Sequence, residues 1–197
     1  MGRATRANTS HIELWGYPGA GKTTTARAAK RAGLSRVHEM RADTAKLSFD
    51  CKLARARAAF AQIKAEQAAA IESADADGSV LFDEGLLNEI WRQLYRNPEF
   101  IGQDWWHEYL ADAQSRIIVL DVAPDCARER IRSKPDMGPI NLELRDAPLD
   151  GEQWERARMA YDAILRELTA RRPDFRFVRY ADGAFQEPHE AIAAHLA

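Results

Sequence analysis

The chain has 197 residues, with 28 basic and 30 acidic side chains and a formal net charge of −2. This length fits one domain that can bury a sizeable core. The near-neutral charge argues against a protein that binds nucleic acid or an anionic membrane with its whole surface, so we expect neither partner. A hydrophobic content of 46% with 29% charged residues excludes a disordered chain.

Strands and helices are predicted to alternate along the chain after a short, flexible, polar tail at residues 1–10. Apolar runs predict five strands, at 11–15, 36–40, 79–82, 116–122 and 175–180. Helices are predicted at 22–32, 43–76 (as one or two helices), 86–96, 100–113, 124–133, 151–172 and 188–196. Three prolines and a glycine predict a mobile loop at 134–150. The alternation predicts an α/β fold with a parallel sheet, in a single domain over 11–197.

Cysteine, histidine and hydropathy patterns exclude several other classes of protein. Two cysteines supply neither a disulfide framework nor a metal-binding pair, so we expect a reducing, cytoplasmic location. Five scattered histidines lack the spacing of a zinc site. No apolar run approaches the roughly 20 residues of a transmembrane helix, and we expect no signal peptide.

One motif carries specific chemistry: residues 16–23, G-Y-P-G-A-G-K-T, satisfy G-x-x-x-x-G-K-[ST]. Its glycines let the backbone approach a phosphate, and its amides can cradle the anion at the start of the next helix. Lys22 is expected to reach the β- and γ-phosphates and Thr23 to ligate Mg²⁺. Its place between a predicted strand and helix favours nucleotide binding over an ordinary glycine-rich turn. The residues predicted to bind ATP are Gly16, Tyr17, Pro18, Gly19, Ala20, Gly21, Lys22, Thr23 and Thr24.

Two acids, Asp83 and Glu84, follow a strand of buried type, at the edge where open α/β sheets bind ligands. A carboxylate there can orient a Mg²⁺-bound water or accept a proton from a substrate hydroxyl. The alternative is that Asp83 caps the following helix and that Glu84 only complements its dipole.

Four cations follow the fourth predicted strand. Arg128 and Arg132 are four residues apart, as are Arg130 and Lys134, so each pair shares a helix face. Cations that close over a transferring phosphoryl group stabilise its charge. The alternative is a solvated helix face.

The acceptor site is predicted less directly. Glu39 and Arg41 follow the second predicted strand and are either acceptor ligands or surface charges. Trp91 has the helical spacing of a core residue and is also a candidate wall of the pocket. Trp105 and Trp106 are about 100° apart on a helix, so we expect that both are not fully buried.

On these residues the sequence resembles the P-loop small-molecule kinases, a group that includes thymidylate, adenylate and shikimate kinases. The loop G-Y-P-G-A-G-K-T-T resembles the adenylate-kinase form, V-L-F-D-E-G (80–85) is similar to a strand of thymidylate and deoxynucleoside kinases, and 119–134 resembles their Arg-bearing lid. The resemblance implies a three-layer P-loop NTPase fold with a five-stranded parallel sheet in order 2-3-1-4-5. It also implies an acceptor-binding helical region at about 41–77 and a lid at about 128–150.

The resemblance further implies ATP and Mg²⁺ as cofactors, a small-molecule acceptor and a homodimer like those of many relatives. Catalytic roles fall on Lys22, Asp83, Arg130 and Arg132, metal binding on Thr23 and Asp83, ATP contacts also on Arg128, and acceptor contacts on Glu39, Arg41, Glu84 and Trp91. The expected activity is transfer of the γ-phosphoryl group of ATP. An alternative is an accessory or regulatory ATPase that acts on a protein partner through an exposed Trp105 or Trp106. A GTPase is disfavoured because the chain has no N-K-x-D motif.

Overall fold

The structure, a computed structural model, describes residues 11–33, 36–39, 51–74, 79–111, 116–134, 138–172 and 175–179. Arg41, the tail, the first part of the predicted acceptor-binding region and the predicted helix at 188–196 lie outside these ranges. No helix within these ranges is both long and apolar enough to cross a bilayer.

A parallel sheet forms the centre of the molecule, and its strands run in the order β2-β3-β1-β4-β5. The strands are β1 (His11–Gly16), β2 (Arg36–Glu39), β3 (Val80–Asp83), β4 (Arg116–Asp121) and β5 (Arg176–Arg179). The α/β class with a parallel sheet is therefore confirmed. Burial of all four central residues of β4 fits a strand covered on both faces.

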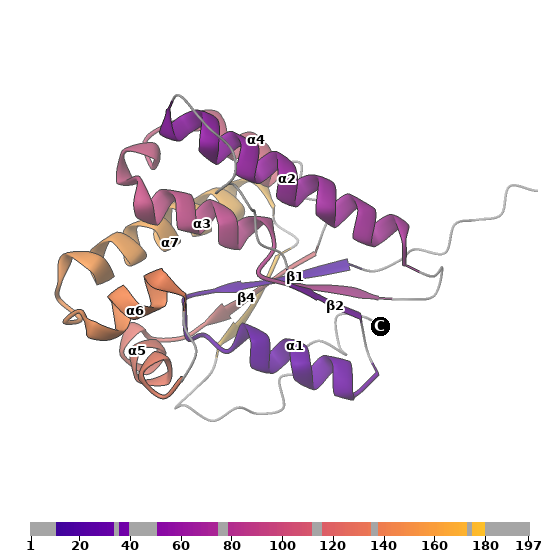
Figure 1. The fold of residues 1–197 in the computed structure, drawn as a ribbon, viewed down its shortest axis with the longest axis horizontal. Helices are drawn as coiled ribbons and strands as arrows, with labels where there is room; N and C mark the ends of the chain where they lie inside the picture. Colours follow the sequence, from indigo (N-terminus) through magenta and orange to yellow (C-terminus); the bar gives the residue numbers. More distant parts are fainter. Residues whose placement is uncertain are drawn as a thin grey trace, which may run out of the picture.

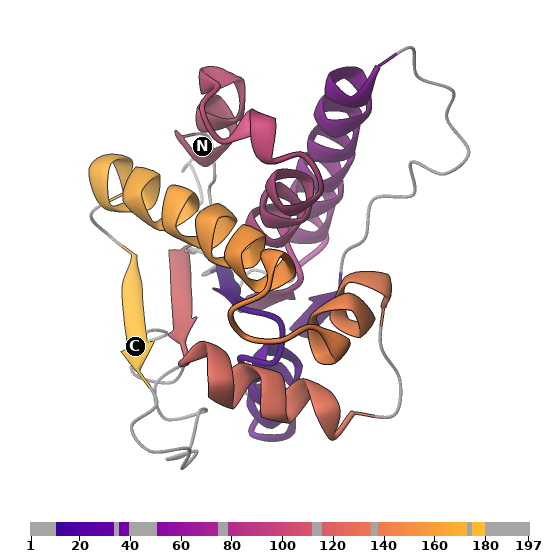
Figure 2. The ribbon, with the colours of Figure 1, turned by 90° about the vertical axis from the view of Figure 1, so that its left-hand side faces the viewer.

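Helices cover both faces of the sheet, so the fold has three layers (Figures 1 and 2). One face carries α1 (Lys22–Arg31) and α5 (Pro124–Arg132). The other carries α2 (Lys52–Glu72), α3 (Leu86–Arg96), α4 (His107–Ala111) and α7 (Glu152–Arg171). The short helix α6 (Pro139–Asp146) lies beside α5 and α7 at one end of the sheet.

Two predictions of secondary structure are wrong, and one alternative is excluded. The segment 134–150 is not a loop throughout, because α6 begins at Pro139, in a first turn where the missing N–H of proline is not needed. The predicted helix at 100–113 is instead two short 3₁₀ turns, Pro98–Phe100 and Asp104–Trp106, followed by α4. Asp83 does not cap the next helix, since Gly85 holds that position.

Candidate active site

The loop between β1 and α1 has the backbone geometry that a phosphate cradle requires. Gly19 has a φ of 84° and Gly21 a φ of 95°, a left-handed conformation that glycine adopts without strain. A Cβ on Gly19 would also overlap the carbonyl oxygen of Ala127 in α5. The conformation and this close packing explain why glycine is needed here, and they hold the loop against the helix that carries the predicted lid cations.

Lys22 points back over this loop. Its ammonium donates hydrogen bonds to the carbonyl oxygens of Gly16, at 3.0 Å, and Tyr17, at 3.1 Å, and the residue is only 8% exposed. Burial lowers its pKa, while the carboxylates of Glu84 and Asp83 oppose that effect. The cation is therefore held at the loop with two acids within electrostatic range.

The residues predicted to hold Mg²⁺ supply suitable ligand atoms. Thr23 is half-buried and lines the cavity described below, whereas Thr24 is exposed. Asp83 ends β3 beside Leu14 of β1 and is 2% exposed. Hydroxyl and carboxylate oxygens suit Mg²⁺, which binds few protein ligands and keeps waters or substrate phosphates. Within the described ranges no group of three acidic, histidine or cysteine ligands gathers, so phosphate oxygens would have to complete such a site.

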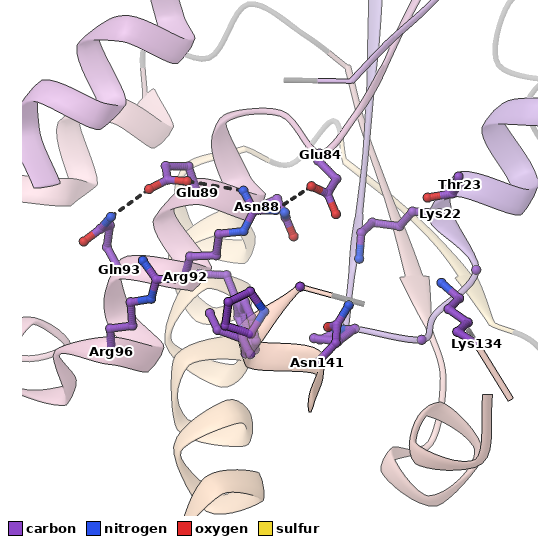
Figure 3. Close-up of a pocket in the computed structure, with 17 residues that line it drawn as sticks. Lys22, Thr23, Glu84, Asn88, Glu89, Arg92, Gln93, Arg96, Lys134 and Asn141 are labelled. Carbon is purple, nitrogen blue, oxygen red and sulfur yellow. Dashed lines mark hydrogen bonds and ion pairs between the residues drawn. The ribbon is translucent and has the colours of Figure 1, made fainter. Parts of the chain in front are cut away.

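A cavity of about 260 Å³ opens next to the loop (Figure 3). Its walls come from the loop and the start of α1, from Glu84 and one face of α3, and from Lys134 with the start of α6. Its lining residues are Pro18, Gly19, Gly21, Lys22, Thr23, Glu84, Asn88, Glu89, Trp91, Arg92, Gln93, Arg96, Lys134, Gly138, Pro139, Ile140 and Asn141. The cavity therefore places the nucleotide-binding motif opposite a wall of polar side chains.

A cluster of charged side chains, Glu84, Glu89 and Arg92, dominates the α3 wall. Arg92 pairs through Nη2 with Glu84 and through Nη1 with Glu89 at 3.4 Å. Glu89 also accepts a hydrogen bond of 2.7 Å from Gln93. Glu84 has a φ of 67°, which is rare for a residue other than glycine and is found where the surroundings hold the backbone. We call these three residues the α3 cluster.

The other predicted acceptor residues lie in different places. Trp91 is 3% exposed, stacks on Tyr95 and donates to the carbonyl oxygen of Ala157 at 3.3 Å, so it belongs to the core while it lines the cavity. Glu39 ends β2 in register with Asp83 of β3, at the carboxyl edge of the sheet.

The structure separates the predicted lid cations. Lys134 lines the cavity, but Arg128 and Arg132 do not. Together with Asp125, Glu129, Ser133 and Leu149, those two arginines line a second, more open hollow on α5. Arg130 is half-buried and lines neither. A role for these arginines at the transferring phosphate remains a prediction.

Sequence reasoning missed much of the polar lining of the cavity. The residues it did not single out are Asn88, Glu89, Arg92, Gln93, Arg96 and Asn141. Five of them recur at helical spacing directly after Asp83 and Glu84, and this periodic polar stripe was a signal that could have found them. The apolar residues of the same helix indicate packing against the core, and this stronger pattern hides the polar one.

Comparison with known proteins gives neighbours in structure alone. The chain is similar to thymidylate kinase from Candida albicans, with a TM-score of 0.66, 14% identity, and coverage of 95% of this chain and 91% of that one. It is also similar to deoxyadenosine kinase from M. mycoides with bound dATP, with a TM-score of 0.61, 18% identity, and coverage of 95% and 98%. The same enzyme with products bound gives a TM-score of 0.56 and 20% identity over 94% and 98%. No protein-family model and no curated protein sequence matches.

These likenesses extend over nearly the whole of each chain, at identities where only the fold is shared. The chain has a P-loop kinase-like fold of the kind found in nucleoside and nucleotide kinases.

Proposed function

We propose that this protein is a kinase that transfers the γ-phosphoryl group of Mg-ATP to a small nucleoside-like, nucleotide-like or otherwise hydroxylated acceptor. The observation that carries the proposal is that one cavity joins Lys22 and Thr23 of the P-loop to the polar wall of α3. A donor site and an acceptor site must meet in this way for direct transfer. The kinase-like fold of the neighbours adds support.

In this proposal the loop amides and Lys22 bind the phosphates of ATP, and the ammonium exchanges its bonds to the loop carbonyls for phosphate oxygens. Thr23 and Asp83 would hold Mg²⁺, which screens the phosphate charge. Lys134 would approach the same phosphates from the segment before α6, since it lines the same cavity as Lys22. Arg128, Arg130 and Arg132 would contribute after movement of α5 and α6 toward bound nucleotide.

Two features bear on the alternative of an accessory ATPase that acts on a protein partner. Trp106 is 1% exposed and donates to the carbonyl oxygen of Phe100 at 3.0 Å. Trp105 is partly buried and stacks on Phe60. As predicted, the two are not both fully buried, but neither is an exposed ring of the kind that the alternative invoked.

Free Cys51 and Cys126 suit the cytoplasmic location that we propose.

Measuring ADP release from Mg-ATP with and without pooled acceptors tests the proposal. Turnover stimulated by an acceptor supports the kinase, whereas nucleotide binding without stimulation supports the accessory ATPase. Asp83→Asn should lower stimulated turnover by about 100-fold or more, because the amide cannot replace the carboxylate as metal ligand or proton acceptor. Survival of turnover to within a few-fold would show that the role assigned to Asp83 is wrong.

A further inference from the structure

The position of the attacking group follows from the proposed function, on which this inference rests. The γ-phosphate must lie at Lys22, so the atom that attacks it must lie at the same end of the cavity. Glu84 stands at that end, because it lines the same cavity as Lys22 and Thr23. Figure 3 shows Glu84 between Lys22 and Arg92.

The charge of the α3 cluster does not suit a second phosphate, on the acceptor, at that end. The α3 cluster has two carboxylates and one guanidinium, which leaves a formal charge of −1 when both acids are ionised. Each terminal nitrogen of Arg92 already pairs with one of the carboxylates, so the two nitrogens that would bind a phosphate in a bidentate way are already occupied. Side chains of Glu84 and Arg92 are each only 20% exposed, which strengthens both their pairing and the repulsion of a second anion.

The other cations that line the cavity do not change this result. In the proposed function Lys22 binds the phosphates of ATP. Arg96 is exposed at the other end of α3, ten residues after Leu86, and the helical rise places it about 15 Å from the start of the helix. Lys134 lies on the P-loop side, where the triphosphate needs its charge. Neither Arg96 nor Lys134 therefore lies where an acceptor phosphate would have to be held to attack the γ-phosphate.

Hydroxyl groups, in contrast, suit the α3 wall. A hydroxyl can donate to the carboxylates of Glu84 and Glu89 and can bond to the amides of Asn88 and Gln93. The left-handed backbone of Glu84 is a second observation in favour of a functional role. Glu84 keeps this conformation between two closely packed neighbours. Asp83 is buried, and a Cβ on Gly85 would come within 2.6 Å of the carboxyl carbon of the buried Glu13.

We infer that the acceptor attacks through a hydroxyl group of a polyhydroxyl compound rather than through a phosphate, and that the α3 cluster sets this preference. A hydroxyl oxygen of the acceptor forms the new bond to the γ-phosphorus. The bond from that phosphorus to the β,γ-bridging oxygen breaks, and ADP leaves with its electron pair. The hydroxyl proton passes to a carboxylate at this end of the cavity, Asp83 or Glu84.

The test compares each acceptor with its own monophosphate. The assay incubates each compound and its monophosphate with Mg-ATP and follows ADP release and product mass. The compounds are the common ribonucleosides and 2′-deoxyribonucleosides, ribose and glucose. We expect kcat/KM for the unphosphorylated member of the best pair to be at least about 100-fold higher. Nucleosides and sugars form separate arms, so the assay also shows which polyhydroxyl source is used.

Charge-neutralising variants then test the α3 cluster itself. Glu84→Gln and Glu89→Gln should each free one side of Arg92 and shift the ratio of kcat/KM toward the monophosphate by about 10-fold. The ratio remains interpretable even if total activity falls. Glu108→Gln makes the same chemical change on exposed α4, away from the cavity, and should leave the ratio unchanged.

The outcomes separate the two claims. Preference for monophosphates, or no change of the ratio in both cluster variants, would overturn this inference while the kinase proposal stands. Failure of both members of every pair to be phosphorylated would count against the proposed function and against this inference with it. Phosphorylation of unphosphorylated members, with the ratio shifted in the variants, supports both.

Discussion

The buried carboxylate of Glu13 makes a quantitative prediction about stability. Glu13 lies in β1, is 1% exposed and accepts hydrogen bonds from the Leu87 amide at 2.6 Å and from the Gln67 amide at 3.1 Å. It thus binds the start of α3, whose own N-cap residue, Gly85, has no side chain to do so. Burial nevertheless raises its pKa from 4.5 to about 7, and the hydrogen bonds and Arg172 oppose this only in part.

The sign and size of the effect follow from the pKa in the folded and unfolded states. Because the folded protein binds this proton more tightly, the stabilisation is fully present below pH 4.5 and is lost as the pH rises through about 7. At about 1.4 kcal/mol for each tenfold change in proton affinity, the loss is about 3 kcal/mol. Glu13→Gln cannot titrate and should not show this loss.

Urea unfolding between about pH 4 and pH 8 measures the difference in the free energy of unfolding between wild type and Glu13→Gln. Subtracting the variant removes the contribution of other titrating groups. We expect the wild type to lose about 3 kcal/mol relative to the variant across this range, and Glu108→Gln to show no such change. A relative change below about 1 kcal/mol would refute the assignment of the raised pKa to the buried Glu13.

Three further predictions, which use four substitutions, test other parts of the structure. Gly19→Ala should abolish ATP binding and lower the free energy of unfolding by at least about 1 kcal/mol, because the backbone there is strained for alanine and its Cβ would overlap a carbonyl oxygen of α5. Nucleotide titration and urea unfolding measure the two effects. Lys134→Ala should raise KM for ATP about 10-fold and Arg132→Ala by less, since only Lys134 lines the cavity; equal effects in steady-state kinetics would contradict the placement. Tyr95→Phe removes the 2.9 Å hydrogen bond to Glu143 that joins α3 to α6 and should cost about 1 kcal/mol in thermal unfolding.

The contrast between the P-loop and α3 shows what could be predicted from the sequence. The P-loop motif is contiguous, from Gly16 to Thr23, and the local backbone requires its glycines. The motif could therefore be recognised directly and its role predicted. The sequence shows that polar residues recur with helical spacing in α3, but it does not show that they line a cavity. The side of a helix that faces a cavity depends on the elements that pack around that helix. In the structure Trp91 packs into the core and also lines that cavity.

Segment 134–150 shows a different kind of error. Its prolines predicted a loop, yet Pro139 begins a helix whose residues Ile140 and Leu144 are buried. The Leu144 carbonyl oxygen accepts a hydrogen bond of 2.9 Å from the indole of Trp154 in α7. Packing against α7 therefore stabilises a short helix that local propensity alone did not predict.

The sequence by itself determined the elements whose signals are local: the strand, loop and helix around Lys22, the buried strands, and the two acids at the end of β3. Only the tertiary structure decided which charges meet. It brings Lys22, the α3 cluster and Lys134 to one cavity, and it leaves Arg128 and Arg132 at another hollow. The physical reason is that side-chain spacing fixes the faces of a single helix, whereas the burial of apolar faces against the sheet and against other helices sets which of those faces are opposed.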